Sequence, residues 1–308
     1  MKISIVGPGR VGSAIGLVLV ARGLVDELVL VSRRPDVAAG EAADLEHAGA
    51  FSRPARVRAG GVQDTADSDI IIIAVSGAAP DATAGRAAGA IATADALREI
   101  IPGIAAVNPE AVLLVVSNPL DAITTLVGRL SGFPPSRVLG TGTLLDTMRL
   151  RIRLSDICGV HPNDLRVYVL GEHGDNQFVA AASASVGGAP LPISIEQLRE
   201  IEHDTRNAGH AIVRSKGYTN HGIALAAAEV VEAIARDDRS VLPLSTLTTG
   251  VAGVNGVCLS LPVIVGRGGS RGVLPVSLSE SEAEAFRKSA TAVRQTLDLI
   301  SPVEASHV

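Results

Sequence analysis

The chain begins Met1-Lys2-Ile3-Ser4-Ile5-Val6-Gly7-Pro8-Gly9-Arg10-Val11-Gly12, and its architecture can be inferred outward from this segment. Residues 3–6 predict a short buried strand, and residues 7–12 have the pattern G-x-G-x-x-G at the start of a predicted helix. In such a turn Gly7 permits the tight bend, Gly9 lets the backbone approach a pyrophosphate, and Gly12 allows the helix to pack closely on the strand. The pattern alone is weak. A second predicted strand that ends at Ser32, about 20 residues later, makes it a strong indication of a dinucleotide-binding domain.

The first half of the chain alternates between β-rich and helical composition. Strands are predicted over 3–6, 28–31, 56–59, 70–75 and 112–116, and helices over 11–22, 36–48, 87–101 and 120–130. The uninterrupted isoleucines at 70–73 are typical of a strand buried on both faces of a parallel sheet. We therefore expect an α/β fold in which residues 1–141 form a doubly wound (Rossmann) parallel sheet.

After Gly142 the pattern changes, which predicts a second, α+β catalytic domain over residues 142–308. The expected elements are a helix over 144–158, strands over 165–170 and 178–185, a helical region over 195–235 interrupted near Gly217, an antiparallel meander over 241–276 and a helix over 280–300.

Composition narrows the class of protein. A length of 308 residues allows two modest domains, and 47% hydrophobic with 19% charged residues is typical of a globular protein. A net charge of −5 without a basic block argues against nucleic-acid binding, and no apolar run is long enough to cross a membrane. The first residues have the pattern of a strand, so no signal peptide is expected, and the presence of only two cysteines argues against a disulfide framework or a Cys-rich metal site. We therefore expect a cytoplasmic protein.

The end of the second predicted strand indicates which dinucleotide is bound. An acidic residue there normally accepts hydrogen bonds from the ribose hydroxyls of NAD, but this chain has Ser32-Arg33-Arg34. One hydroxyl and two guanidiniums suit a 2′-phosphate, so NADP is the expected cofactor and NAD remains possible. The alternative is that Arg33 and Arg34 are only solvated loop residues.

Gly171-Glu172-His173-Gly174-Asp175 directly follows a predicted strand and presents a histidine between two glycines. Upstream, Asp146 and Arg149 are three residues apart on a predicted helix and therefore share one face. A histidine with a carboxylate partner and a nearby guanidinium is typical of a proton-transfer site with an anion clamp. The alternative is a loop histidine beside an exposed helical ion pair.

Five segments together resemble the L-lactate/malate dehydrogenase family over nearly the whole chain. They are Gly40–His47, Ser117–Asp121, Gly140–Arg149, Gly171–Asp175 and Lys216–Thr219. The resemblance implies that His173 exchanges a proton with the substrate hydroxyl during hydride transfer and that Asp146 orients its ring. It further implies cofactor contacts from these positions: Gly7, Gly9, Arg10, Val11, Gly12, Ser32, Arg33, Arg34, Val116 and Asn118.

The same resemblance implies a small 2-oxo acid or 2-hydroxy acid as the substrate. Arg149 would clamp its carboxylate, Asn118 would orient the reacting oxygen, and Thr219 would border the pocket. Arg86 would lie on a closing lid and polarise the carbonyl. Family members of this kind form oligomers, so a homodimer or homotetramer is expected.

The predicted lid departs from the pattern of malate-specific members, which carry a second arginine for the distal carboxylate. The matching position here is Pro80 or a neighbour, and Asp81 would repel a carboxylate. A monocarboxylic substrate is therefore expected, with malate dehydrogenase as the alternative. A non-catalytic dinucleotide-binding regulator is the alternative from another functional class.

Two further inferences concern sites outside the predicted active site. Arg151 and Arg166 fall where some bacterial members of the family bind an anionic activator, although ordinary surface charge explains them equally simply. The remaining histidines show no ligand-like grouping, so no metal site is expected.

Overall fold

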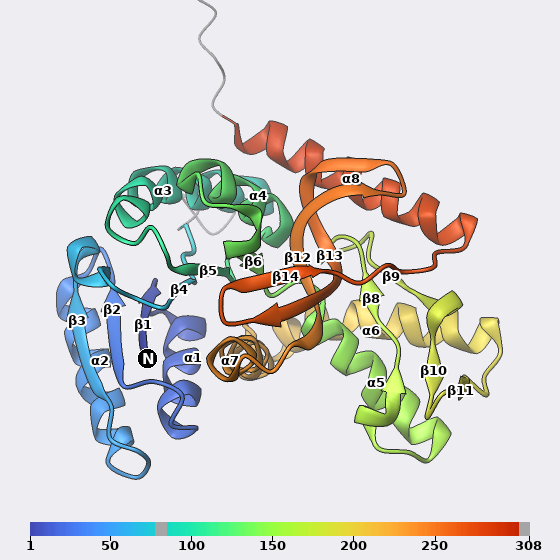
Figure 1. Cartoon of the computed structure of the whole chain (residues 1–308), viewed down its shortest axis with the longest axis horizontal. Helices are drawn as coiled ribbons and strands as arrows, with labels where there is room; N and C mark the ends of the chain where they lie inside the picture. The colour runs from blue at the N-terminus through green and yellow to red at the C-terminus, as the bar shows by residue number, and fades with distance from the viewer. Residues whose placement is uncertain (78–84, 302–308) are drawn as a thin grey trace, which may run out of the picture.

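The fold is centred on one nine-stranded sheet with the order β14-β13-β12-β6-β5-β4-β1-β2-β3 (Figure 1). This is a computed structural model that describes residues 1–77 and 85–301, with only the backbone of residues 85 and 86. The parallel part consists of β1 (Lys2–Val6), β2 (Glu27–Val31), β3 (Arg56–Gly60), β4 (Ile70–Ile73), β5 (Val112–Val115) and β6 (Val138–Gly140). The chain starts in the middle and winds outward in both directions, which confirms the predicted doubly wound topology.

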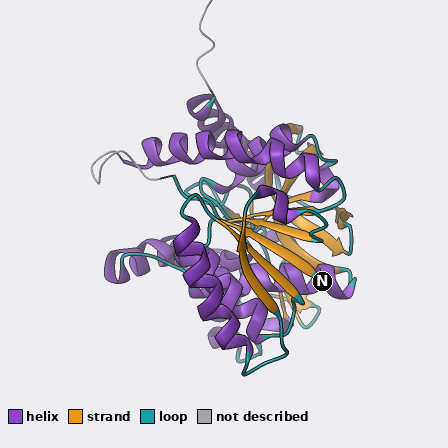
Figure 2. Ribbon diagram, turned by 90° about the vertical axis from the view of Figure 1, so that its left-hand side faces the viewer, coloured by secondary structure: helices purple, strands orange, loops and turns teal. Residues whose placement is uncertain are grey.

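Helices cover both faces of this sheet (Figure 2). Ile70 and Ile72 pack on one face with residues of α1 (Arg10–Ala21), α2 (Pro35–Gly49) and α7 (His221–Arg236). Ile71 and Ile73 pack on the other with residues of α3 (Gly85–Val107), α4 (Leu120–Ser131) and α8 (Glu280–Ile300). Alternate side chains of one strand therefore enter two separate cores, as expected for a strand buried on both sides.

The antiparallel meander predicted over 241–276 is confirmed, and the structure adds that it extends the sheet of the N-terminal half. Its strands are β12 (Ser240–Val251), β13 (Val254–Gly266) and β14 (Gly269–Val273). The parallel and antiparallel parts of the sheet are connected by one β-ladder pair, in which Ser245 of β12 lies opposite Gly140 of β6.

A smaller lobe carries the rest of the C-terminal half (Figure 1, lower right). It contains α5 (Leu144–Cys158) and α6 (Ile195–Lys216) beside two small sheets, β11-β10-β7 and β8-β9. Leu150, Leu154 and Leu198 help to form its apolar core. The helices predicted over 144–158 and 280–300, and the interruption near Gly217, are confirmed.

The single strands predicted over 165–170 and 178–185 are wrong. The first region forms β7 (Leu165–Arg166) and β8 (Val169–Leu170), which pair in different sheets. Between them the carbonyl of Tyr168 accepts a hydrogen bond from the N–H of Ala180, which continues the β8–β9 register by one residue. The carbonyl of Val167 instead accepts one from the side chain of Arg151, so the ladder of β7 does not continue into β8. The second region forms β9 (Phe178–Val179), a 3-10 turn η4 (Ala181–Ser183) and β10 (Ser185–Val186).

The remaining elements are short. They are the strand β11 (Ala189–Pro190) and the 3-10 turns η1 (Val62–Thr65), η2 (Pro135–Arg137) and η3 (Pro162–Asp164).

Candidate active site

The glycine-rich turn after β1 has the geometry that a dinucleotide requires. Gly7 has φ +91°, and a Cβ at this position would lie 2.6 Å from the carbonyl oxygen of Ala74. A Cβ on Gly9 would instead meet nothing within 4 Å. The turn is therefore tightly packed on its inner side and open on the side from which a phosphate would approach.

The beginning of α1 fits an anionic group. Gly9 occupies the N-cap, no side chain caps the helix, and no acidic residue lies in its first turn. The first backbone N–H groups are thus left for an external acceptor, as in pyrophosphate binding. Arg10, the first helical residue, places its guanidinium carbon 4.5 Å from the ring centre of Tyr218. This contact brings the segment between α6 and α7 against the glycine-rich turn.

The end of β2 presents two guanidiniums to solvent. Ser32 is half-buried, and its hydroxyl accepts a hydrogen bond from the backbone N–H of Arg34 at 3.1 Å. Arg33 and Arg34 are exposed, and neither forms a salt bridge with another residue for which the structure gives a side chain. Among residues 1–77 and 87–301 no carboxylate pairs with either guanidinium, so both face solvent where an anion could bind.

His173, Asp146 and Arg149 come together as their sequence positions predict. Asp146 Oδ2 lies 2.7 Å from His173 Nδ1, and Asp146 Oδ1 accepts a hydrogen bond from Arg149 Nη1 at 3.0 Å. The Asp146 side chain is 4% exposed, whereas those of His173 and Arg149 are 30% and 19% exposed. A buried carboxylate therefore holds two basic groups that remain accessible to a ligand.

Asp146 also controls the charge of His173. Burial by itself lowers the pKa of His173, but the attraction and the hydrogen bond of Asp146 outweigh burial, and the net pKa is raised. Burial likewise opposes ionisation of Asp146, yet His173 and Arg149 hold the pKa of this carboxyl below its ordinary value. Because Asp146 occupies Nδ1, Nε2 is the nitrogen through which the imidazole can exchange a proton with a substrate.

The backbone of the His173 loop is anchored on two sides. Gly171 has φ +86°, and its N–H and C=O both bond to Ser260 of β13. A Cβ on Gly171 would lie 2.5 Å from Ser289 Oγ, so no larger residue fits this turn. The N–H of His173 donates to Asp121 Oδ2 at 2.6 Å.

Gly209 of α6 lies beside the Arg149 guanidinium. A Cβ at Gly209 would be 3.6 Å from Arg149 Nη1, which is an ordinary van der Waals contact. Thr219 lies between α6 and α7, next to Tyr218, and is half-buried. A carboxylate bound by Arg149 would thus approach between α5 and α6.

The structure describes Val116 and Asn118 completely, but only the backbone of Arg86. Val116 is buried and Asn118 is exposed, and both follow the carboxyl end of β5, next to β4 and β1. Arg86 lies in the first turn of α3, but its side chain is outside the described atoms. Pro80 and Asp81 also fall outside the described residues.

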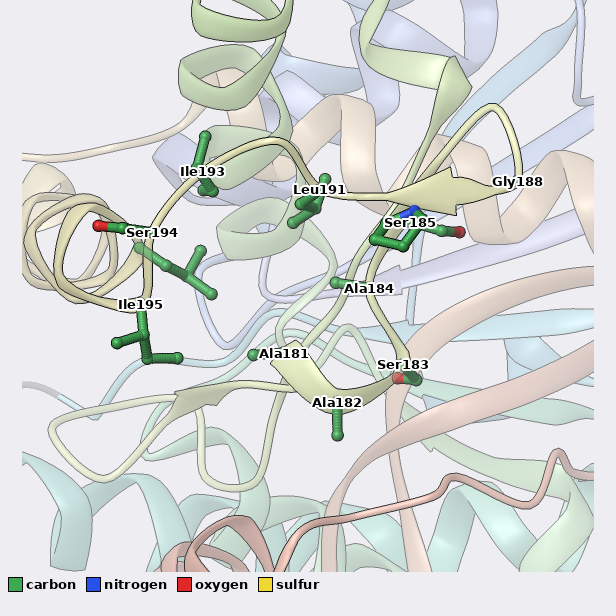
Figure 3. Close-up of a pocket in the computed structure, with 12 residues that line it drawn as sticks. Ala181, Ala182, Ser183, Ala184, Ser185, Gly188, Leu191, Ile193, Ser194 and Ile195 are labelled. Atoms are coloured by element: carbon green, nitrogen blue, oxygen red, sulfur yellow. The ribbon is translucent and has the colours of Figure 1, made fainter.

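A cavity of about 510 Å³ lies elsewhere in the smaller lobe, between η4, the β10–β11 hairpin and the start of α6 (Figure 3). Its lining consists of Ala, Ser, Gly, Pro, Leu and Ile residues, including Leu191 and Ile195. It contains no ionisable side chain and none of the predicted site residues, so it offers no group for proton transfer.

Arg151 is engaged within the protein. Its Nε donates to the carbonyl of Val167 at 3.2 Å, and its guanidinium lies 5.4 Å from the ring centre of Tyr168. Burial lowers the pKa of Arg151, with a smaller effect of the nearby exposed Arg166. Arg151 and Arg166 lie close enough to affect each other's charge, but the guanidinium of Arg151 is already in contact with Val167 and Tyr168.

In the described part of the chain, no group of three or more His, Cys, Asp or Glu residues could hold a metal ion. None of the described helices combines the length and apolarity needed to cross a bilayer.

Sequence reasoning missed two contacts of the site. Asp121 ends the Ser117–Asp121 segment that resembles the family, but the sequence does not show that it binds the backbone N–H of His173, 52 residues away. The packing of Arg10 on Tyr218 likewise joins distant segments. The only available signal was that Asn118 and Asp121 are three residues apart at the start of one helix.

Comparison with known proteins identifies the family. A family model described as the NAD-binding domain of lactate/malate dehydrogenase matches residues 1–140, and one described as its α/β C-terminal domain matches residues 143–302. The chain belongs to the lactate/malate dehydrogenase family. It is accordingly an NAD(P)-dependent 2-hydroxy acid dehydrogenase that binds a nicotinamide dinucleotide, as its sequence predicts.

Several lactate dehydrogenases resemble this family member over almost its full length. The L-lactate dehydrogenase of Clostridium perfringens is 38% identical over 298 residues, which cover 94% of each chain. L-lactate dehydrogenase 1 of Clostridium acetobutylicum is 37% identical and covers 97% of this chain and 98% of its own. The solved structure of the minor L-lactate dehydrogenase from Enterococcus mundtii has a TM-score of 0.93 at 30% identity, covering 98% and 99% of the two chains. That of a lactate dehydrogenase from a Medee basin deep-sea metagenome library has a TM-score of 0.92 at 32% identity, covering 97% and 98%.

Proposed function

We propose that the protein interconverts a monocarboxylic 2-oxo acid and its (S)-2-hydroxy acid, with NADP as the preferred cofactor. The observation that carries the chemistry is the pair of contacts at Asp146, which join a proton-transfer group to an anion-binding group. When bound, the dinucleotide donates or accepts the hydride at C2.

In this proposal His173 is the acid and base of the reaction. During reduction, Nε2 gives its proton to the C2 oxygen as that oxygen becomes a hydroxyl, and during oxidation it takes the proton back. Asp146 keeps the proton on Nδ1 and stabilises the imidazolium, since its carboxylate lies 2.7 Å from that nitrogen.

The other residues bind and orient the substrate. Arg149 clamps the carboxylate through two parallel N–H···O bonds, and its side chain is 19% exposed. Asn118 bonds to the reacting oxygen, Arg86 polarises the carbonyl when the lid closes, and Thr219 borders the pocket.

Replacement of His173 by Asn tests the acid–base role. We expect His173→Asn to lower kcat by about 10²–10⁴-fold while dinucleotide binding, followed by fluorescence, stays unchanged. The exposed His47 offers a matched control, since His47→Asn removes an imidazole far from the proposed chemistry. Turnover that persists in His173→Asn would refute the assignment. A wild type inactive on every 2-oxo acid would instead favour a non-catalytic dinucleotide-binding regulator.

The preference for NADP is inferred from the exposed Arg33 and Arg34 at the end of β2, where NAD-specific proteins normally have an acidic residue. A charge-assisted contact with the 2′-phosphate should favour NADPH over NADH by about ten- to a hundredfold in kcat/KM. Arg33→Ala should remove most of that ratio, whereas Arg153→Ala, on the exposed surface of α5, should keep it. A wild type that prefers NADH, or a ratio unchanged in Arg33→Ala, would overturn this part of the proposal.

The monocarboxylic substrate is inferred from the lack of a cationic residue in the lid sequence at Pro80, and it agrees with the lactate dehydrogenases among the relatives. A panel of 2-oxo acids should show pyruvate or a longer monocarboxylic acid to be preferred. If oxaloacetate exceeds them by orders of magnitude in kcat/KM, the protein is a malate dehydrogenase instead.

We also propose that residues 1–141 form the dinucleotide-binding domain and residues 142–308 the catalytic domain, and that the enzyme is a cytoplasmic homodimer or homotetramer. Light scattering coupled to gel filtration would give the mass of the assembly directly. A mass of 31.4 kDa, that of one chain, would contradict the predicted association.

A further inference from the structure

Asp121 is a buried carboxylate of the N-terminal half that reaches the catalytic loop of the C-terminal half. It lies in the first turn of α4, three residues after Asn118, and is 2% exposed. Its Oδ2 accepts the backbone N–H of His173 at 2.6 Å, and its Oδ1 accepts the hydroxyl of Ser245 on β12 at 2.6 Å. One side chain thus ties three separate elements together beside the active site.

This carboxylate is not explained by the helix that carries it. No side chain caps the N-terminus of α4, so Asp121 does not serve as a cap. No lysine or arginine in the described part of the chain neutralises it, and an unpaired buried charge is unfavourable. Burial raises the pKa of Asp121 to about 6, against the opposing effects of Ser245 and His173. Both carboxylate oxygens of Asp121 accept hydrogen bonds from residues of the C-terminal half, and its negative charge raises the pKa of His173 there.

We propose that Asp121 is a second positioning carboxylate for His173. Asp146 holds the imidazole ring, and Asp121 holds the main chain of the same residue and favours its protonated form through its negative charge. Because Asp121 belongs to the turn that begins at Asn118, it also sets the position of the proton donor relative to Asn118. This inference rests on the proposed acid–base role of His173 and does not depend on the cofactor preference or on the size of the substrate.

The proposal has a specific consequence for the pH dependence of the reductive reaction. Reduction requires protonated His173, so titration of His173 alone would limit the rate only at high pH. A protonated carboxyl or an amide at this position can still accept the N–H of His173 and can donate to Ser245 Oγ, so what its neutralisation removes is the negative charge. Because that charge raises the pKa of His173, its removal should move the alkaline limb of reductive kcat/KM toward acid. The ionisable groups around this pair are Glu172 on the catalytic loop, Cys258 on β13, and Asp146 and Arg149 on α5.

The test is the reductive kcat/KM between pH 5 and 10 for the wild type and three variants. Asp121→Asn keeps an acceptor for the N–H of His173 but loses the charge, and it should move the alkaline limb about one unit toward acid. Ser245→Ala keeps the charge of Asp121 and should leave the alkaline limb in place. Asp298→Asn, the same charge change on the exposed side of α8, should leave the profile unchanged.

A uniform loss of rate in Asp121→Asn with the alkaline limb in place would show a merely structural role and overturn the proposal. If Asp121→Asn does not fold, Asp121→Ala, which also removes the charge, decides, and an unmoved alkaline limb overturns the proposal. The outcome is separable from that of the proposed function. Turnover in His173→Asn refutes the acid–base assignment, whereas an inactive His173→Asn with an unchanged profile in Asp121→Asn refutes only the role of Asp121.

Discussion

Replacing Asp146 by Asn removes the negative charge that contacts both the His173 imidazole and the Arg149 guanidinium. The shape of the side chain is almost unchanged. In the native protein the two oxygens of Asp146 receive His173 Nδ1 at 2.7 Å and Arg149 Nη1 at 3.0 Å. An amide has one oxygen for these two donors, so at least one contact is lost and neither remains charge-assisted from the Asp146 side.

The size of the effect follows from these two contacts. Each charge-assisted hydrogen bond contributes about 1.5–3 kcal/mol, so about 3–6 kcal/mol is at stake. Since about 1.4 kcal/mol corresponds to a factor of ten, reductive kcat/KM at pH 7 should fall about 10²–10⁴-fold. The pKa of His173 is raised chiefly because Asp146 outweighs burial. Without that charge its pKa should drop, and the alkaline limb of the reductive profile should move to lower pH.

Steady-state oxidation of the reduced dinucleotide, followed by absorbance from pH 5 to 10, measures both quantities. Asp156→Asn is the matched control, because Asp156 lies on the same helix but is exposed at its far end. Circular dichroism should show that both variants are folded. The reasoning is wrong if Asp146→Asn keeps kcat/KM within about threefold of the wild type and its alkaline limb does not move.

Three further outcomes are expected. Arg149→Lys should raise the KM for the 2-oxo acid about ten- to a hundredfold, because an ammonium cannot form two parallel bonds to a carboxylate; an unchanged KM in steady-state assays would exclude the clamp. Gly7→Ala should lower the free energy of unfolding by about 1–3 kcal/mol or more, because Gly7 has φ +91° and an added Cβ would lie too close to the carbonyl oxygen of Ala74. Urea unfolding curves with equal midpoints and slopes for the wild type and the variant would contradict this. In the native enzyme at pH 8 a thiol reagent should spare Cys258, whose burial raises its pKa to about 12, and react at the half-buried Cys158; two equivalents titrated without denaturant would be inconsistent with the buried position.

Much of the fold could be predicted because its determinants are local. The isoleucines of β4 predict a strand buried on both faces, and both faces are indeed covered. The helix over 144–158 could likewise be placed from its pattern, which put Asp146 and Arg149 on one face before any contact was known. The doubly wound topology follows once such strands alternate with helices.

The features that could not be predicted depend on partners far away in sequence. Residues 165–170 have the composition of one strand, yet the segment is divided because its two ends pair with different strands. Asp121 resembles an ordinary first-turn acid of a helix, and only the folded structure shows that it receives the N–H of His173. Every residue except proline has a backbone N–H, so the sequence does not show which of these groups the side chain of Asp121 will bind.

The single pair Gly140–Ser245 that joins β6 to β12 limits how this protein could be shortened or recombined. A polypeptide truncated just after Gly142 would end with one side of β6 uncovered, and an open strand edge recruits other chains into aggregates. The same truncation would remove both hydrogen-bond donors of Asp121, the hydroxyl of Ser245 and the N–H of His173. A nucleotide-binding cassette excised from this enzyme would therefore need a replacement segment along β6 before it could serve as an independent module.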